Sequence, residues 1–146
     1  MEKKEIVVHH VNDLMFAGKG ASNHWTIIES EFEGNTPAAT GPMELVLVAL
    51  GGCTGSDVVS ILRKKRTSLY SLTMNITGER ADEHPKVFTK IHVEYIFKGK
   101  ALRLRDVERA VELSTTKYCS VSAMLSKSAV ITHSCTIVDG TDERTR

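Results

Sequence analysis

The feature that most constrains this sequence is a run of twelve residues without a charge, Leu45–Ser56, inside a longer helical pattern. Pro42 suits the first position of a helix, and Glu44 places a negative charge at the positive end of the helix dipole. Basic residues at 63–66 suit the carboxyl end of the same helix. The pattern therefore predicts one long helix from Pro42 to about Lys65.

This helix is apolar on nearly every side, which indicates burial. Its charge-free run is too short to span a bilayer, so we expect no contact with a membrane. A row of small side chains follows the helix and permits the close approach of another backbone. The members of this row are Ala49, Cys53, Ser56 and Ser60. Because a small sheet cannot wrap such a helix alone, we expect a second subunit to cover part of it.

Composition sets the class of protein. A chain of 146 residues has enough material for one core, so we expect a single domain over 1–146, with a frayed tail at 139–146. A net charge of +1 argues against nucleic-acid binding by bulk charge. Three cysteines and the lack of a secretory signal at the start predict a cytoplasmic protein with reduced thiols.

Strands and helices do not alternate regularly, which predicts an α+β fold. We expect a second helix with Asp106 as its N-cap. The expected strands are Ile6–Val11, Leu14–Ala21, His24–Ser30, Ser71–Arg80, Lys86–Phe97 and Ala129–Val138. Alternation in the fifth strand predicts one shared face made of Val87, Thr89, Ile91, Val93, Tyr95 and Phe97.

The three cysteines have different surroundings. Cys53 lies among three glycines in an apolar helix, and the residues alone favour a buried small hydrophobe over a reactive thiol. Cys119 falls on a polar face if the second helix is unbroken, which predicts half exposure. Alternatively, a new helical segment starts here, and its backbone N–H groups lower the pKa of the thiol. Cys135 lies on the apolar face of the last strand and is interpreted as structural.

Two further features concern ligands and charge. Cys135 shares its face with His133, but zinc needs three or four ligands, so we expect no metal site and no cofactor. Asp57 lies one helical turn after Cys53 inside the apolar stretch. A buried carboxylate needs partners, and we expect an arginine, a lysine or backbone donors.

Two segments carry a resemblance to a known family. Gly41-Pro42-Met43-Glu44-Leu45, followed by Gly51-Gly52-Cys53-Thr54-Gly55, and the segment Lys117–Ser122 around Cys119 resemble the OsmC/Ohr family of thiol peroxidases. The segment Glu83–His92 is similar to the YhfA-like branch of this family. The resemblance covers most of residues 10–138. It implies two central helices clasped by antiparallel sheets in an intertwined homodimer.

The resemblance also implies a chemistry. Cys53 matches the peroxidatic cysteine of the family and Cys119 the resolving one, which reverses the interpretation from the residues alone. The implied partners are an organic hydroperoxide or another apolar small molecule, and an external dithiol reductant. Glu44, Asp57 and Lys19 are the candidate supporting residues.

The sequence departs from the family pattern at the pair that activates the thiol. The peroxidases carry a glutamate directly after the helix-opening proline, where this chain has Met43, with Glu44 one residue later. Their arginine in the N-terminal hairpin aligns with Ala17, with Lys19 nearby. Without this pair we expect slow peroxide reduction. The alternative is a non-catalytic dimeric binding module for an apolar small molecule that retains the fold.

Overall fold

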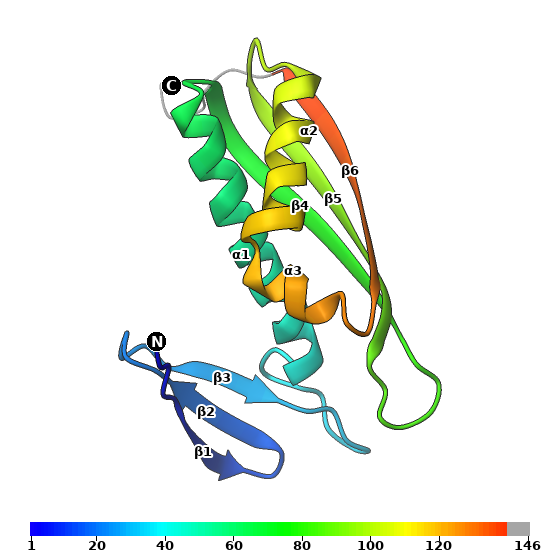
Figure 1. Ribbon diagram of the computed structural model, residues 1–146. Coiled ribbons are helices and arrows are strands. Elements are labelled where there is room, and N and C mark those ends of the chain that lie inside the picture. The colour runs from blue at the N-terminus through cyan, green and yellow to red at the C-terminus, as the bar shows by residue number, and fades with distance from the viewer. Residues whose placement is uncertain (140–146) are drawn as a thin grey trace. The chain divides into compact units, whose positions relative to one another are not determined.

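A computed structural model describes residues 1–139, which fall into two compact units divided between Val46 and Leu47. The single domain expected over the whole chain stays a prediction. The elements in chain order are β1 (Val7–Asn12), β2 (Met15–Lys19), β3 (Thr26–Glu29), α1 (Pro42–Lys64), β4 (Ser68–Arg80), β5 (Phe88–Lys100), α2 (Leu104–Leu113), η1 (Ser114–Tyr118), α3 (Ser120–Leu125) and β6 (Val130–Asp139) (Figure 1).

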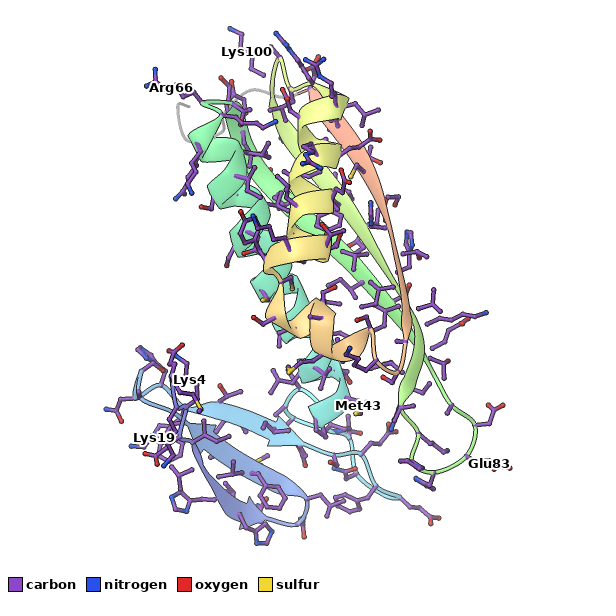
Figure 2. The ribbon with its side chains drawn as sticks, viewed as in Figure 1. Lys4, Lys19, Met43, Arg66, Glu83 and Lys100 are labelled. Carbon is purple, nitrogen blue, oxygen red and sulfur yellow. The ribbon has the colours of Figure 1, made fainter. Side chains whose placement is uncertain are left out.

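The first unit is an antiparallel sheet in the order β1-β2-β3. The loop after β3 is tied back to the strand by Glu29, whose side chain is buried. Its carboxylate accepts hydrogen bonds from Asn35 Nδ2 at 3.1 Å and from the backbone N–H of Ala38 at 2.6 Å. These bonds hold the loop that leads into the first turn of α1, where Met43 lies (Figure 2).

The second unit contains a mixed sheet in the order β4-β5-β6. Strands β4 and β5 are antiparallel, whereas β6 runs parallel to β5, so the prediction of purely antiparallel sheets is wrong here. The reason is the helical connection α2–η1–α3, because parallel neighbours need a crossover of this kind. Helices α1 and α2 cover the same face of the sheet (Figure 1). The β4–β5 loop with Glu83 marks one end of the unit, and Arg66 and Lys100 mark the other (Figure 2).

Helix α1 begins at the predicted residue and ends one residue early. Gly51 and Gly55 bring it close to β4, because a Cβ on them would lie 3.1 Å from Ile76 Cδ1 and 2.8 Å from Met74 Cε. Close approach therefore depends on these glycines and not on the predicted row of small residues. Three members of that row are exposed in this chain: Ala49, Ser56 and Ser60.

Within the single chain α1 is buried on one face, and burial of its remaining surface by a second subunit stays a prediction. Leu50, Val58 and Leu62 are buried, but Val48 is 61% exposed. The 23-residue helix is long and apolar enough for a membrane span, because an 18-residue window within it has a mean hydropathy of 1.9, although the expectation from its charge-free run was the opposite. A core helix of a soluble protein passes the same test, and α1 packs against the sheet with one face.

The alternation of β5 is confirmed in its central part. Four of the six predicted residues are buried: Ile91, Val93, Tyr95 and Phe97. Val87 and Thr89 are exposed, so the prediction is wrong at the start of the strand. A register shift between Glu79 and Arg80 changes the alternation there, and Phe88 is buried instead.

The second predicted helix begins earlier than expected and is broken into three segments. Helix α2 has Arg103 at its N-cap, with no side-chain cap, so the prediction of Asp106 is wrong. The Asp106 carboxylate instead lies 3.2 Å from Lys65 Nζ. At the other end of the chain, Asp139 is the last residue of β6, which is one residue into the predicted tail. Residues 140–146 lie outside the described residues.

Candidate functional site

The second unit brings together the two cysteines that the resemblance singled out. Cys53 is half-buried in the middle of α1, and Cys119 is 3% exposed between η1 and α3. Both are free thiols. The Cys53 side chain lies near enough to Cys119 to interact with it, and this interaction raises the pKa of the Cys119 thiol. Two residues far apart in the sequence therefore form one dithiol site.

A wide turn of π-helix places Cys119. Segment η1 ends at Tyr118, and the Cys119 backbone N–H donates to the Ser114 carbonyl oxygen at 2.8 Å. Cys119 is then the N-cap of α3, and its Sγ accepts the backbone N–H of Ser122 at 3.3 Å. The alternative that a new helical segment starts here is confirmed. The half-exposed position on an unbroken helix is wrong, because a π-turn adds a residue and rotates the rest of the helix by about 100°.

Burial dominates the proton affinity of Cys119. It raises the pKa of the thiol to about 11, with smaller contributions in the same direction from Cys53 and from the charge of Asp57. The Ser122 N–H favours the thiolate and lowers the pKa, but by less than burial raises it. The expectation that a helix start gives Cys119 a lowered pKa is therefore wrong.

This pKa predicts how Cys119 reacts with iodoacetamide. At pH 8 a thiol of pKa about 11 is ionised in about one molecule in a thousand, and only the thiolate is alkylated. We expect the alkylation rate of Cys119 to rise about tenfold per pH unit from pH 8 to pH 10. Peptide mass spectrometry of quenched samples measures it. A rate that is already constant below pH 9 would contradict the burial argument.

The same shift has a consequence for stability. The folded-state pKa of Cys119 exceeds its ordinary value of 9.0, so the folded protein holds this proton more tightly than the unfolded chain does. Titration of Cys119 therefore causes no pH dependence in the free energy of unfolding below pH 9. It makes this free energy fall as the pH rises from 9 toward 11. Urea titrations across this range, with Cys119→Ser as the control, measure the contribution.

A chain of buried hydroxyl groups lies beside the dithiol. Thr54 Oγ1 is 2.8 Å from Tyr95 Oη and 2.8 Å from Ser114 Oγ, and Ser114 Oγ donates to Asp57 Oδ2 at 2.9 Å. Ser114 has one proton and gives it to the carboxylate, so it accepts from Thr54. Thr54 in turn accepts from Tyr95. The chain therefore has one direction, from Tyr95 through Thr54 and Ser114 to Asp57.

The hydroxyl chain supplies the hydrogen-bond donor to the Asp57 carboxylate. An arginine, a lysine or backbone donors were expected, but the partner is the Ser114 hydroxyl, and within residues 1–139 Asp57 forms no ion pair. Burial raises the pKa of the Tyr95 hydroxyl, which keeps it protonated as the donor at the other end. Ser114 and Tyr95 were not predicted as site residues from the sequence. No local pattern marks them, because they lie 60 and 41 residues from Thr54.

The other candidate residues have local partners. Lys19 belongs to the first unit, donates to Asn23 Oδ1 at 2.8 Å and lies 4.7 Å from the centre of the Trp25 ring. Glu44 is exposed in the first turn of α1. Ala17, which aligns with the family arginine, pairs with strands β1 and β3 in the middle of the first sheet.

Cys135 has different neighbours from those of Cys53 and Cys119. It is half-buried on β6, opposite Tyr95 in the strand register. Burial, with a smaller contribution from Glu108, raises the pKa of its thiol. Within residues 1–139, no group of three or more histidine, cysteine or carboxylate side chains is placed to hold a metal ion.

Comparison with known proteins shows the family to which the chain belongs. The OsmC-like protein family matches residues 33–134, and the protein is a member of it. Protein YhfA of Escherichia coli (strain K12) is 43% identical over 131 residues, which cover 90% of this chain and 96% of that protein. The resemblance inferred from the sequence is thus confirmed.

Solved structures show the same fold. A hypothetical protein from Aquifex aeolicus VF5 has a TM-score of 0.87 and 33% identity, and the match covers 97% of this chain and all of that chain. An OsmC-like protein from Mycoplasma pneumoniae has a TM-score of 0.81 at 15% identity, covering 94% of this chain and 98% of that one. The organic hydroperoxide resistance protein OhrB of Bacillus subtilis has a TM-score of 0.60 at 12% identity, covering 92% and 98%.

Proposed function

We propose that the protein is a thiol-dependent peroxidase that reduces organic hydroperoxides through Cys53 and Cys119. The Cys53 sulfur attacks the distal peroxide oxygen, the O–O bond breaks, and the alkoxide leaves and takes up a proton as the alcohol. The Cys119 sulfur then attacks the sulfenic acid on Cys53. The S–S bond forms, and hydroxide leaves with the Cys119 proton as water. An external dithiol reduces the disulfide by exchange.

The observation that carries this proposal is the interaction between the two thiols, together with their unequal exposure. Cys53 is the more accessible, which suits the thiol that meets an external oxidant. Cys119 is buried beside it and, with a pKa raised to about 11, is protonated at neutral pH, which suits a thiol that reacts only after Cys53 is oxidised.

One equivalent of cumene hydroperoxide tests the proposal. Intact and peptide mass spectrometry should show a disulfide between Cys53 and Cys119 in the wild type and in Cys135→Ser. Cys119→Ser should instead accumulate sulfenic acid on Cys53, which dimedone traps. A wild-type protein that keeps both thiols free after this treatment would refute the peroxidase mechanism.

We also propose that the protein is cytoplasmic and acts as a homodimer in which a second copy covers the exposed face of α1. A groove of about 620 Å³ runs along this face. It is lined by small residues and Val59 of α1, by the basic Arg63 and Lys64 near the end of the helix, and by Leu72 and Met74 of β4. Val48, on the same helix, is largely exposed. Burying such a face against its own copy gives a closed, symmetric contact.

The alternative is a binding module for an apolar small molecule. A cavity of about 400 Å³ beside the site favours it. Ile61, Leu113 and Tyr118 supply apolar lining, and Asp57, Ser60, Lys64 and Lys65 supply polar and charged groups at the same cavity. Native mass spectrometry of the purified protein distinguishes the two functions. A co-purified small molecule, together with unreactive thiols, supports the binding module.

A further inference from the structure

We propose that Ser114 is a positioning residue. It holds the π-turn η1 and the Cys119 that follows it against α1, and so keeps the Cys119 thiol within reach of Cys53. This inference rests on the proposed function for the roles of the two thiols. The two hydrogen bonds of the Ser114 hydroxyl go to Thr54 and Asp57 and not to either sulfur. Ser114 acts through the backbone of Cys119 and through two side chains of α1.

Ser114 joins the two halves of the dithiol by hydrogen bonds on both of its sides. On the α1 side, its hydroxyl accepts from Thr54, which follows Cys53, and donates to Asp57, one turn later. On the other side, its carbonyl oxygen accepts the Cys119 N–H at 2.8 Å and closes the π-turn. Ser114 is 0% exposed and Thr54 1%, so water does not compete for these bonds.

The directed chain explains why a serine is needed at this place. Asp57 accepts the only proton of Ser114, so the bond to Thr54 forms because Thr54 donates, with Tyr95 donating behind it. Every hydroxyl in the chain therefore has a partner on both sides except the terminal Tyr95. Ser114→Ala removes both of these hydrogen bonds to α1 at once, whereas the backbone bond that closes the π-turn remains.

The expected consequence concerns the closure of the disulfide and not the attack on peroxide. Closure brings two sulfurs together within one molecule, and its equilibrium depends on how well the fold holds them near each other. In a glutathione buffer the exchange is balanced: the protein dithiol and oxidised glutathione give the protein disulfide and two molecules of reduced glutathione. The equilibrium constant is the effective concentration of the two thiols.

The experiment measures this effective concentration by acid quenching, alkylation and mass spectrometry, in a Cys135→Ser background. We expect Ser114→Ala to lower it by about tenfold or more. Tyr95→Phe is the matched control, since it removes a buried hydroxyl from the same chain but leaves both Ser114 bonds in place. Its effective concentration should stay within about threefold of the parent. An unchanged or higher value for Ser114→Ala would overturn the inference.

A second pair of variants keeps the test readable if Ser114→Ala does not fold. Asp57→Ala removes the acceptor of the Ser114 proton, whereas Asp57→Asn keeps an oxygen in its place. We expect the alanine variant to lower the effective concentration and the asparagine variant to retain it. Equal values for the two would also overturn the inference.

The readouts separate this inference from the proposed function. Glutathione exchange needs no peroxide, so thiols that are inert to cumene hydroperoxide refute only the peroxidase. If the wild type reacts with peroxide and Ser114→Ala keeps the parent effective concentration, only the positioning role is refuted. Thermal unfolding of each variant is a further control, because general destabilisation would lower the melting temperature of Tyr95→Phe as well.

Discussion

Replacing Gly52 with arginine should convert a dimer of this protein into a monomer. Gly52 is exposed on α1, and a Cβ built on it meets no atom within 4 Å, so the isolated chain has room for a side chain. In the proposed dimer this space is filled by the second copy. An unpaired guanidinium buried there, once per subunit, should weaken association by about a hundredfold or more.

Sedimentation velocity at micromolar concentration measures the effect. Thr73→Arg is the matched control, since Thr73 is exposed on β4 and its neighbour Met74 is the residue that contacts α1. The control should remain dimeric, and circular dichroism should show both variants folded. A wild-type protein that sediments as a monomer, or a Gly52→Arg variant that stays dimeric, would contradict the proposed packing of α1.

The sequence predicted α1 well because its signals are local. Pro42 and Glu44 mark the beginning of the helix, and the basic residues after Ile61 mark its end, so each boundary lies within one residue of the prediction. Its degree of burial was not predictable in the same way. An apolar helix surface indicates that something covers it, but the pattern does not say whether that is the same chain, a second copy or lipid.

The second helical region was predicted poorly because its register changes within it. The five-residue π-turn from Ser114 to Tyr118 has no signature in the hydrophobic pattern, yet it decides that Cys119 is buried. Similarly, the register shift near Arg80 moved the buried position at the start of β5 to Phe88. A single inserted residue changes which side chains face the core, and alternation alone does not reveal it.

The candidate site could be predicted only in part, because most of its members lie far apart in the sequence. Cys53 and Cys119 were identified through the family resemblance, and the structure brings them together. The hydroxyl chain around them was not found, because its members come from α1, β5 and the π-turn and meet only in the folded state. Asp57 indicated that a buried partner was needed, but a carboxylate in an apolar stretch does not specify which donor satisfies it.

Thr54 lies in the middle of the hydroxyl chain that runs from Tyr95 to Asp57. Its hydrogen bonds should contribute strongly to the stability of the protein, and Thr54→Val should reveal this contribution. Valine has nearly the same shape as threonine but neither donates nor accepts a hydrogen bond. The Tyr95 hydroxyl then loses its acceptor and Ser114 Oγ loses its donor, in a region where all three residues are at most 1% exposed. A buried Tyr95 hydroxyl without an acceptor and a buried Ser114 oxygen without a donor should lower the free energy of unfolding by about 2–5 kcal/mol.

Thr54→Ser is the matched control, because it keeps the hydroxyl and loses only a methyl group, at a cost of about 1 kcal/mol. Urea denaturation at pH 7 and equal protein concentration compares the two variants, since dimer formation makes stability depend on concentration. We expect the valine variant to be the less stable of the two. If serine destabilises the protein as much as valine does, the methyl group of Thr54 and not its hydroxyl carries the stability, and the directed chain from Tyr95 to Asp57 contributes nothing measurable to the fold.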